Sequence, residues 1–147
     1  MIRLAAHKDY DAVMKIWLDT NIETHFYIPK SFWQTQADKV RGMFKEADIY
    51  VFEESGQIKG FIGIMFYDYI AGLFVAEPFK HRGIGTELLK KVQDIYEKLE
   101  LNVYQKNKSA ICFYEKNGFQ IQKQGTNADT NEPEFLMRWH KTHSTGT

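Results

Sequence analysis

The fold of this chain is constrained most by a turn with two glycines that joins a strand-like run to an amphipathic helical pattern. The run Tyr69–Val75 is rich in apolar and aromatic residues, ends before Glu77 and Pro78, and leads into the turn Lys80–Gly85. After Gly85, apolar residues recur with the spacing of one helix face: Leu88, Leu89, Val92, Ile95, Tyr96 and Leu99. A strand, a glycine turn and a helix start gather backbone N–H groups and the positive end of a helix dipole around one point. The segment therefore predicts a phosphate site.

The charges of the turn stand out because the chain as a whole is neutral. Nineteen basic residues balance nineteen acidic ones, so bulk charge gives no general attraction to nucleic acid or to a membrane. Lys80, His81 and Arg82 nevertheless lie together, and Gly83 and Gly85 let the backbone approach a ligand and adopt unusual dihedral angles. The alternative is a tight turn with solvated basic side chains and no ligand.

Two common phosphate-binding motifs are excluded by spacing. A dinucleotide-binding fingerprint requires a glycine three residues after Gly85, and that position is Leu88. A P-loop requires lysine and then serine or threonine after its last glycine, whereas Gly85 is followed by Thr86 and Glu87. The predicted phosphate site therefore belongs to another class of protein.

The remaining pattern predicts one mixed α/β domain. A chain of 147 residues with 44% hydrophobic and 15% aromatic residues can bury one core, and we expect the domain to cover residues 1–139, followed by a polar tail over 140–147. Ser31 and Gln34 form the pattern of a capping box at a helix start. The expected helices cover about 13–20, 31–44, 85–99 and Lys108–Lys116. The expected strands are Ile2–Ala5, Ile49–Glu53, Ile58–Phe66, Tyr69–Val75, Leu99–Tyr104, Phe119–Gln122 and Phe135–Trp139, with a hairpin turn at Glu54–Gln57.

The glycine turn and its flanks resemble motif A of the GCN5-related N-acetyltransferases. The matching residues are Leu73, Phe74, Val75, Pro78, Arg82, Gly83, Ile84, Gly85, Leu88 and Leu89. The resemblance implies that Leu73, Phe74 and Val75 expose backbone groups to the pantetheine arm of acetyl-CoA, and that the amides from His81 to Thr86 hold its pyrophosphate. Lys80 departs from the family's usual glutamine or arginine but keeps a long polar side chain.

A second segment resembles motif B of the same family. Its residues are Asn107, Ala110, Phe113, Tyr114, Gly118 and Phe119. The resemblance implies that Asn107 binds the cofactor arm and that Tyr114 protonates the departing thiolate, which a hydroxyl with an ordinary pKa of about 10 can do. Taken singly, Asn107 reads as a helix N-cap and Tyr114 as a core aromatic residue. We expect Cys112 to be a small core residue with no catalytic role.

The family resemblance also implies the architecture and the reaction. It implies a mixed, mostly antiparallel sheet of six or seven strands, splayed between the fourth and fifth strands and flanked by about four helices. The acetyl group of acetyl-CoA would pass to a primary amine by direct attack in a ternary complex, with CoA as the product. A backbone N–H near Phe74 would stabilise the oxyanion.

The general base and the acceptor site are less constrained by the sequence. Many family members carry a glutamate on the fourth or fifth strand, but the comparable position here is Asn102, and Glu100 lies two residues away on the same face. His25 is the titratable candidate in the segment Thr20–Pro29, which walls the acceptor site in similar enzymes. The residues expected to form an acceptor cleft are His25, Phe26, Tyr67, Tyr69 and Tyr104, each of which reads equally well as structural.

The acceptor and the setting of the protein remain expectations. The chain looks most like small stand-alone bacterial members, some of them peptidyl-lysine acetyltransferases, which implies protein lysine side chains as one acceptor class and small amines, amino acids or antibiotics as the other. A non-catalytic acyl-CoA-binding regulatory module is the alternative to an enzyme. The single cysteine and the lack of a long apolar run predict a soluble cytoplasmic protein with no metal site. The sequence leaves the oligomeric state open between a monomer and a homodimer.

Overall fold

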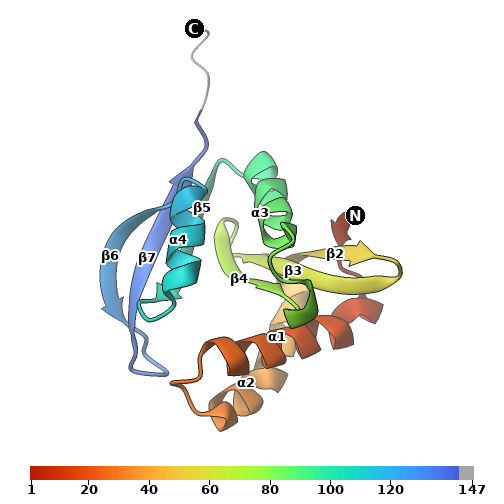
Figure 1. The fold of residues 1–147 in the computed structure, drawn as a ribbon, viewed down its shortest axis with the longest axis horizontal. Coiled ribbons are helices and arrows are strands. Elements are labelled where there is room, and N and C mark those ends of the chain that lie inside the picture. The colour runs from red at the N-terminus through yellow and green to blue at the C-terminus, as the bar shows by residue number, and fades with distance from the viewer. Residues whose placement is uncertain (143–147) are drawn as a thin grey trace, which may run out of the picture. The chain divides into compact units, whose positions relative to one another are not determined.

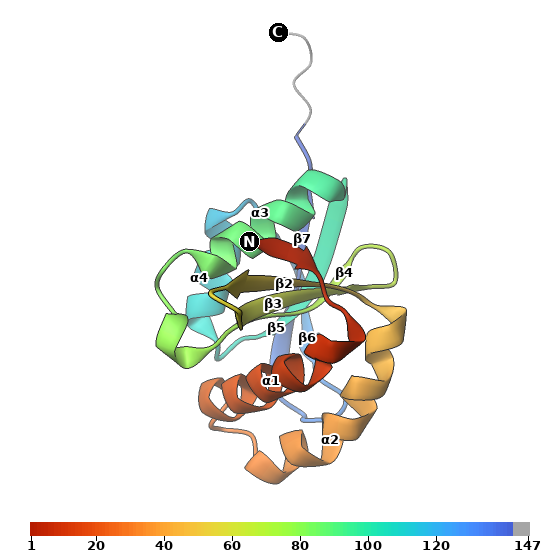
Figure 2. The same ribbon diagram turned by 90° about the vertical axis from the view of Figure 1, so that its right-hand side faces the viewer.

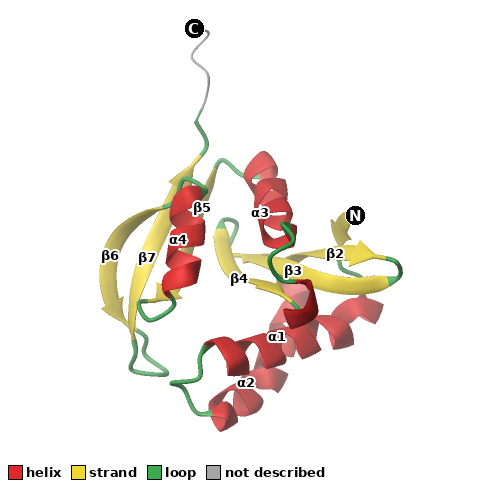
Figure 3. Ribbon diagram, viewed as in Figure 1, coloured by secondary structure: helices red, strands yellow, loops and turns green. Residues whose placement is uncertain are grey.

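The computed structural model describes residues 1–142, which form seven strands and four α-helices (Figure 3). The mixed α/β class predicted from the sequence is confirmed. The chain divides into two compact units, Met1–Val92 and the part from Gln93 onward, and the boundary falls within the third helix. Residues 143–147 of the expected tail lie outside the described residues, and the single-domain reading stays a prediction.

The first unit is built on four antiparallel strands, β1 (Ile2–Leu4), β2 (Asp48–Glu54), β3 (Gln57–Met65) and β4 (Tyr69–Val75), each paired with the next. The predicted hairpin between β2 and β3 is confirmed. Its turn holds Ser55 at φ 55° and Gly56 at φ 75°, the left-handed angles that suit the twist of the flanking strands.

Helices cover both faces of these strands. In Figures 1 and 2, α1 (Tyr10–Thr24) and α2 (Lys30–Met43) lie on one face, and α3 (Ile84–Ile95) lies on the other. A Cβ atom at Gly60 would meet Ile84 at 3.2 Å and Leu88 at 3.4 Å, so α3 packs closely on β3 there. This packing fixes the start of α3, and with it the glycine turn, at the end of β4.

The start of α2 differs from the prediction. The helix begins at Lys30, directly after Pro29, and no side chain caps it. Ser31 lies inside the first turn, so the capping box predicted from Ser31 and Gln34 is wrong. Pro29 precedes the helix in an extended conformation, with φ −56° and ψ 136°, so the helical conformation begins only at Lys30.

The second unit contains β5 (Lys98–Tyr104), α4 (Lys108–Lys116), β6 (Gln120–Thr126) and β7 (Pro133–His140). β7 pairs antiparallel with both β5 and β6. The ring of Phe119 packs on Tyr114 of α4 at 5.3 Å and stacks on Trp139 of β7 at 6.4 Å, which fastens α4 to the strands. Gly118, at φ 93°, ends α4 as predicted. No helix within residues 1–142 is long and apolar enough to cross a membrane.

The turn between β3 and β4 places two large aromatic residues in strained, exposed positions. Phe66 has φ 52° and Tyr67 has φ 74°, and their side chains are 72% and 94% exposed.

We expect the double variant Phe66→Asn, Tyr67→Gly to raise the free energy of unfolding by about 1–2 kcal/mol, because asparagine and glycine adopt left-handed angles readily. Urea unfolding measures this change. Phe26→Asn, which removes another exposed aromatic ring, serves as the control, and an equal gain in both variants would contradict the role assigned to the backbone.

Candidate functional site

The glycine turn is shaped by two left-handed residues. His81 has φ 65° and Gly83 has φ 84°, and both residues are exposed. Gly85 lies inside the first turn of α3 and is not among the residues with positive φ, so the unusual dihedral expected at Gly85 is wrong. Only Gly83 needs the conformational freedom of glycine; Gly85 contributes its lack of a side chain.

The start of α3 supplies the donors that a phosphate site requires. The first helical hydrogen bond runs from the N–H of Glu87 to the carbonyl of Gly83, at 3.0 Å. Helix geometry therefore leaves the N–H groups of Ile84, Gly85 and Thr86 without intrahelical acceptors. These donors and the helix dipole form an anion site at the end of β4.

The basic side chains of the turn are held in different ways. Lys80 Nζ pairs with Glu77 at 2.9 Å, and this ion pair lowers the pKa of Glu77 below its usual value. Arg82 lies over the ring of Phe79 at 5.9 Å. Glu77 was not predicted from the sequence as part of this site, although its i,i+3 spacing from Lys80 indicates an ion pair. Arg82 and His81 remain exposed beside the turn.

The outward backbone donors of β4 follow from its pairing with β3. Ala76 N–H donates to the carbonyl of Lys59 at 2.9 Å, so strand alternation turns the N–H of Phe74 toward β3 as well. The N–H groups of Leu73 and Val75 therefore point to the other edge of β4. The oxyanion donor was expected near Phe74; the N–H that points away from β3 is that of Leu73, one residue earlier.

A β-bulge lies immediately before these donors. Gly63 pairs with Gly72, but the next pair is Ile64 with Ile70, which leaves Ala71 as an extra residue on β4. Bulges re-aim backbone and side-chain groups and are common beside active sites. Here the bulge marks the point on β4 from which Leu73 presents its N–H.

In the second unit, the structure shows what surrounds the motif B residues. Asn107 caps α4, because its Oδ1 accepts from the N–H of Ala110 at 3.3 Å. Tyr114 is 8% exposed, with its ring against Phe113 and Phe119, and burial raises the pKa of its hydroxyl above the usual value. Asn107 is thus a helix N-cap and Tyr114 a core aromatic residue, and neither of these structural roles conflicts with a role toward the cofactor.

Two expectations on the second unit meet different outcomes. Glu100 Oε2 accepts hydrogen bonds from Nε of Arg138 at 2.8 Å and from its Nη2 at 2.6 Å, and its role as a base stays a prediction. Cys112 is exposed rather than a core residue, so that expectation is wrong. Its position two residues before the buried Tyr114 puts it on the opposite face of α4.

His25 lies in an aromatic cluster after α1. Its ring is 8% exposed, packs against Trp33 at 5.6 Å, and shares a hydrogen bond of 2.9 Å between Nδ1 and the hydroxyl of Tyr27. Burial lowers the pKa of His25 to about 4. The imidazole is therefore neutral at pH 7, and its conjugate acid is too strong for it to be an effective base toward an ammonium group.

This shift predicts how stability depends on pH. The pKa of His25 is lower in the folded than in the unfolded chain, so stability is full above pH 6.5 and falls as the pH drops toward 4. We expect His25 to account for a loss of about 1–2 kcal/mol in the free energy of unfolding between pH 7 and pH 5. Urea unfolding at several pH values gives the free energy of unfolding as a function of pH. This dependence on pH should be weaker in His25→Gln than in wild type. It should be unchanged in His140→Gln, because His140 is exposed. An equal dependence on pH in wild type and His25→Gln would refute the assignment.

The expected acceptor residues lie in different surroundings. Phe26 is 84% exposed after α1, and Tyr67 occupies the turn after β3. Tyr69 is the first residue of β4 and is half-buried. In the second unit the hydroxyl of Tyr104 accepts a hydrogen bond from Thr130 at 3.4 Å. The acceptor cleft expected from these residues is therefore not confirmed and stays a prediction.

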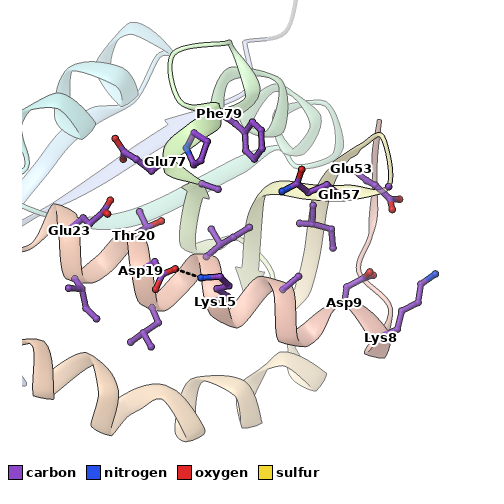
Figure 4. Close-up of a pocket in the computed structure, with 18 of the residues that line it drawn as sticks. Lys8, Asp9, Lys15, Asp19, Thr20, Glu23, Glu53, Gln57, Glu77 and Phe79 are labelled. Carbon is purple, nitrogen blue, oxygen red and sulfur yellow. Dashed lines mark hydrogen bonds and ion pairs between the residues drawn. The ribbon is translucent and has the colours of Figure 1, made fainter.

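A groove of about 1040 Å³ runs along α1, between that helix, the turn from β2 to β3 and the segment 76–79 (Figure 4). Charged side chains of both signs line it beside apolar ones, and Lys15 pairs with Asp19 at 2.8 Å in its centre. None of the predicted cofactor residues lines it, although Glu77 and Phe79 come directly before the glycine turn. No group of three or more metal-ligating side chains was found within residues 1–142.

Comparison with known proteins agrees with both motifs. Residues 45–121 match the model of the acetyltransferase (GNAT) domain. The peptidyl-lysine N-acetyltransferase YiaC of Escherichia coli is 36% identical over 140 residues, covering 95% of this chain and 96% of the relative.

Two solved structures share the fold. The solution structure of the apo-form of YjaB from Escherichia coli has a TM-score of 0.81 at 23% identity, with 95% of this chain and 96% of that chain covered. The PaiA N-acetyltransferase of Thermoplasma acidophilum, in complex with coenzyme A, has a TM-score of 0.80 at 17% identity, with 95% and 98% covered. With its glycine turn, its bulged β4 and a near full-length relative at 36% identity, the chain belongs to the GNAT family of acetyl-CoA-dependent N-acetyltransferases.

Proposed function

We propose that this N-acetyltransferase modifies lysine side chains of proteins. The observation that carries the proposal is the 36% identity, over 95% of this chain, to a protein named as a peptidyl-lysine N-acetyltransferase. A second relative with that name, YjaB of Escherichia coli, is 26% identical over 137 residues. We also propose a cytoplasmic location, which the exposed thiol of the chain's single cysteine supports.

The first step assigned to this chain is to hold the cofactor by its pyrophosphate. The N–H groups at the start of α3 donate to the phosphate oxygens, and Gly83 provides the left-handed angle that aims the turn. Arg82 and His81 add positive charge at the edge of the turn. The bound acetyl-CoA supplies an activated acyl group, the thioester.

The second step is to orient the thioester and stabilise the charge that develops on its carbonyl oxygen. The outward N–H of Leu73 is the donor in the right place on β4, directly after the bulge at Ala71. A fixed backbone donor of this kind contributes about 3–4 kcal/mol to transition-state stabilisation. Val75, two residues further on, presents the next outward N–H to the pantetheine arm.

The third step concerns protons. The attacking amine must be neutral, so an ammonium group with a pKa near 10.4 loses its proton first. Because Glu100 is paired with Arg138 and His25 is buried as a neutral imidazole, we assign this proton to water rather than to either side chain. Tyr114, protonated throughout the neutral range, donates to the departing sulfur.

The proposal is tested by incubating the purified protein with acetyl-CoA, a library of lysine-containing peptides and a panel of small amines, and by reading the products by mass spectrometry. Acetylation of lysine side chains in peptides, at rates above those of all small amines, is the expected result. If only a small amine were acetylated, the acceptor would be a small molecule and the proposal of protein lysine side chains would be wrong. Binding of CoA without any transfer would favour a regulatory acyl-CoA-binding module.

A further inference from the structure

An apolar cavity of about 160 Å³ lies beneath β4 in the first unit, on the face covered by α1 and α2. No charged side chain lines it, and Trp17 is the only lining residue whose side chain carries a nitrogen or oxygen atom. Its lining consists of Trp17, Val40, Met43, Phe44, Ala47, Ile49, Phe61, Gly63, Met65, Ala71, Gly72 and Phe74. We call this cavity the β4 hollow.

The β4 hollow exists because two glycines face each other on adjacent strands. Gly63 of β3 pairs with Gly72 of β4, so two neighbouring positions on one face of the sheet lack side chains. A Cβ atom at Gly72 would overlap the ring of Phe74, which leans over that glycine. A Cβ atom at Gly63 would make only an ordinary contact with Ile49, at 3.9 Å. The space above Gly63 is therefore open and can be filled by a larger side chain.

The position of the hollow ties it to the reacting end of the cofactor. Ala71, Gly72 and Phe74 line it, and they flank Leu73, whose N–H is the donor proposed for the thioester carbonyl. A chain attached to that carbonyl carbon thus starts beside the hollow. Ala71, which lines the hollow, is itself exposed at the bulge.

We propose that the β4 hollow receives the acyl chain of acyl-CoA, so that this enzyme also transfers straight acyl groups of about four to six carbons. The inference rests on the proposed N-acyltransferase function. In the reaction the neutral lysine nitrogen attacks the thioester carbonyl carbon, a C–N bond forms and the C–S bond breaks. The nitrogen loses one proton to water and the sulfur gains one, which gives an N-acyl-lysine and free CoA.

The size and chemistry of the hollow favour this occupant over water. A water molecule in a cavity needs two or more polar partners, and the lining of the hollow is mostly apolar. An apolar cavity of roughly 150 Å³ in another protein stays dry and takes up benzene, a molecule of six carbons. The β4 hollow therefore has room for a chain well beyond the methyl group of acetyl.

The first test is the affinity of the purified protein for CoA, acetyl-CoA, butyryl-CoA, hexanoyl-CoA and decanoyl-CoA, measured by calorimetry without any acceptor. Each methylene that enters the hollow should tighten binding by roughly three- to fourfold. Affinity should rise from acetyl to hexanoyl and fall at decanoyl. A constant affinity, or one that falls beyond acetyl, would overturn the proposal.

Two variants test the location of the acyl chain. Gly63→Val fills part of the hollow and should remove most of the preference for hexanoyl-CoA over acetyl-CoA, whereas Met43→Ala enlarges it and should move the optimum to a longer chain. Gly125→Val is the matched control, because Gly125 is exposed on β6 and a Cβ atom there would meet no atom within 4 Å. A wild-type preference in Gly63→Val would place the acyl chain elsewhere and overturn the proposal.

A transfer assay with the same acyl-CoA series separates this inference from the proposed function. If the affinity series behaves as expected but no acyl group reaches peptide lysines, the acceptor proposal fails and the hollow keeps its role. If only acetyl binds tightly and is transferred to peptides, the acceptor proposal stands and the inference about the hollow fails. An acceptor side chain in the hollow would instead make the affinity for peptide, and not for acyl-CoA, sensitive to Gly63→Val, which also overturns the proposal.

Discussion

Replacing Gly83 by glutamate is expected to lower the affinity for CoA by at least about 100-fold, because a carboxylate would stand beside the N–H groups that hold the pyrophosphate. The substitution also forces a residue with a Cβ atom to adopt φ 84°, which costs about 1–2 kcal/mol of folding free energy. Calorimetric titration with CoA measures the affinity, and urea unfolding measures the stability.

The matched control for this variant is Gly56→Glu in the turn between β2 and β3. Gly56 has φ 75° and, like Gly83, has no atom within 4 Å of a Cβ position, so the backbone strain is similar. Gly56→Glu should lose comparable stability and keep its affinity for CoA. If the two variants bound CoA equally well, the glycine turn would not be the pyrophosphate site.

Tyr114→Phe is expected to lower kcat by about 100-fold or more, because it removes the hydroxyl that protonates the leaving thiolate and keeps the ring that packs on Phe113 and Phe119. The KM for acetyl-CoA should change little. Burial raises the pKa of Tyr114, so its hydroxyl stays protonated from pH 6 to pH 9. A fall in wild-type activity toward alkaline pH within that range would therefore arise from another group.

Tyr50→Phe is the control for loss of a half-buried tyrosine hydroxyl, because Tyr50 lies on β2 and has no role in the proposed chemistry. Steady-state rates with a fixed peptide acceptor compare the two variants. A kcat for Tyr114→Phe within twofold of wild type, with unchanged stability, would remove Tyr114 from the mechanism.

The sequence predicted those elements that carry their own start and stop signals. β4 and α4 were predicted with the observed bounds, since Pro78 follows the one and Asn107 and Gly118 bracket the other. The end of α1 was not predicted, because its last turn is polar. There the buried Asn21 donates to the carbonyl of Trp17 at 2.9 Å, a contact that apolar periodicity does not show.

The candidate site also has features that the sequence predicts and features that it does not. The glycine turn was predicted because its residues are contiguous, and the family comparison confirms the class of protein they indicate. The direction of each N–H on β4 was not predictable, because it depends on the register between β4 and β3, which the hydrogen bond from Ala76 to Lys59 fixes. The predicted splay between β4 and β5 stays a prediction.

A Cβ atom at Gly72 would overlap the ring of Phe74, so substitutions at these two positions depend on each other during evolution. A side chain larger than hydrogen at the position of Gly72 requires a smaller residue, or another rotamer, at the position of Phe74. Either change would reshape the space under the bulge. Among diverging descendants of this chain, these two positions should therefore vary together, and the pair of residues found there should report which acyl donor each descendant accepts.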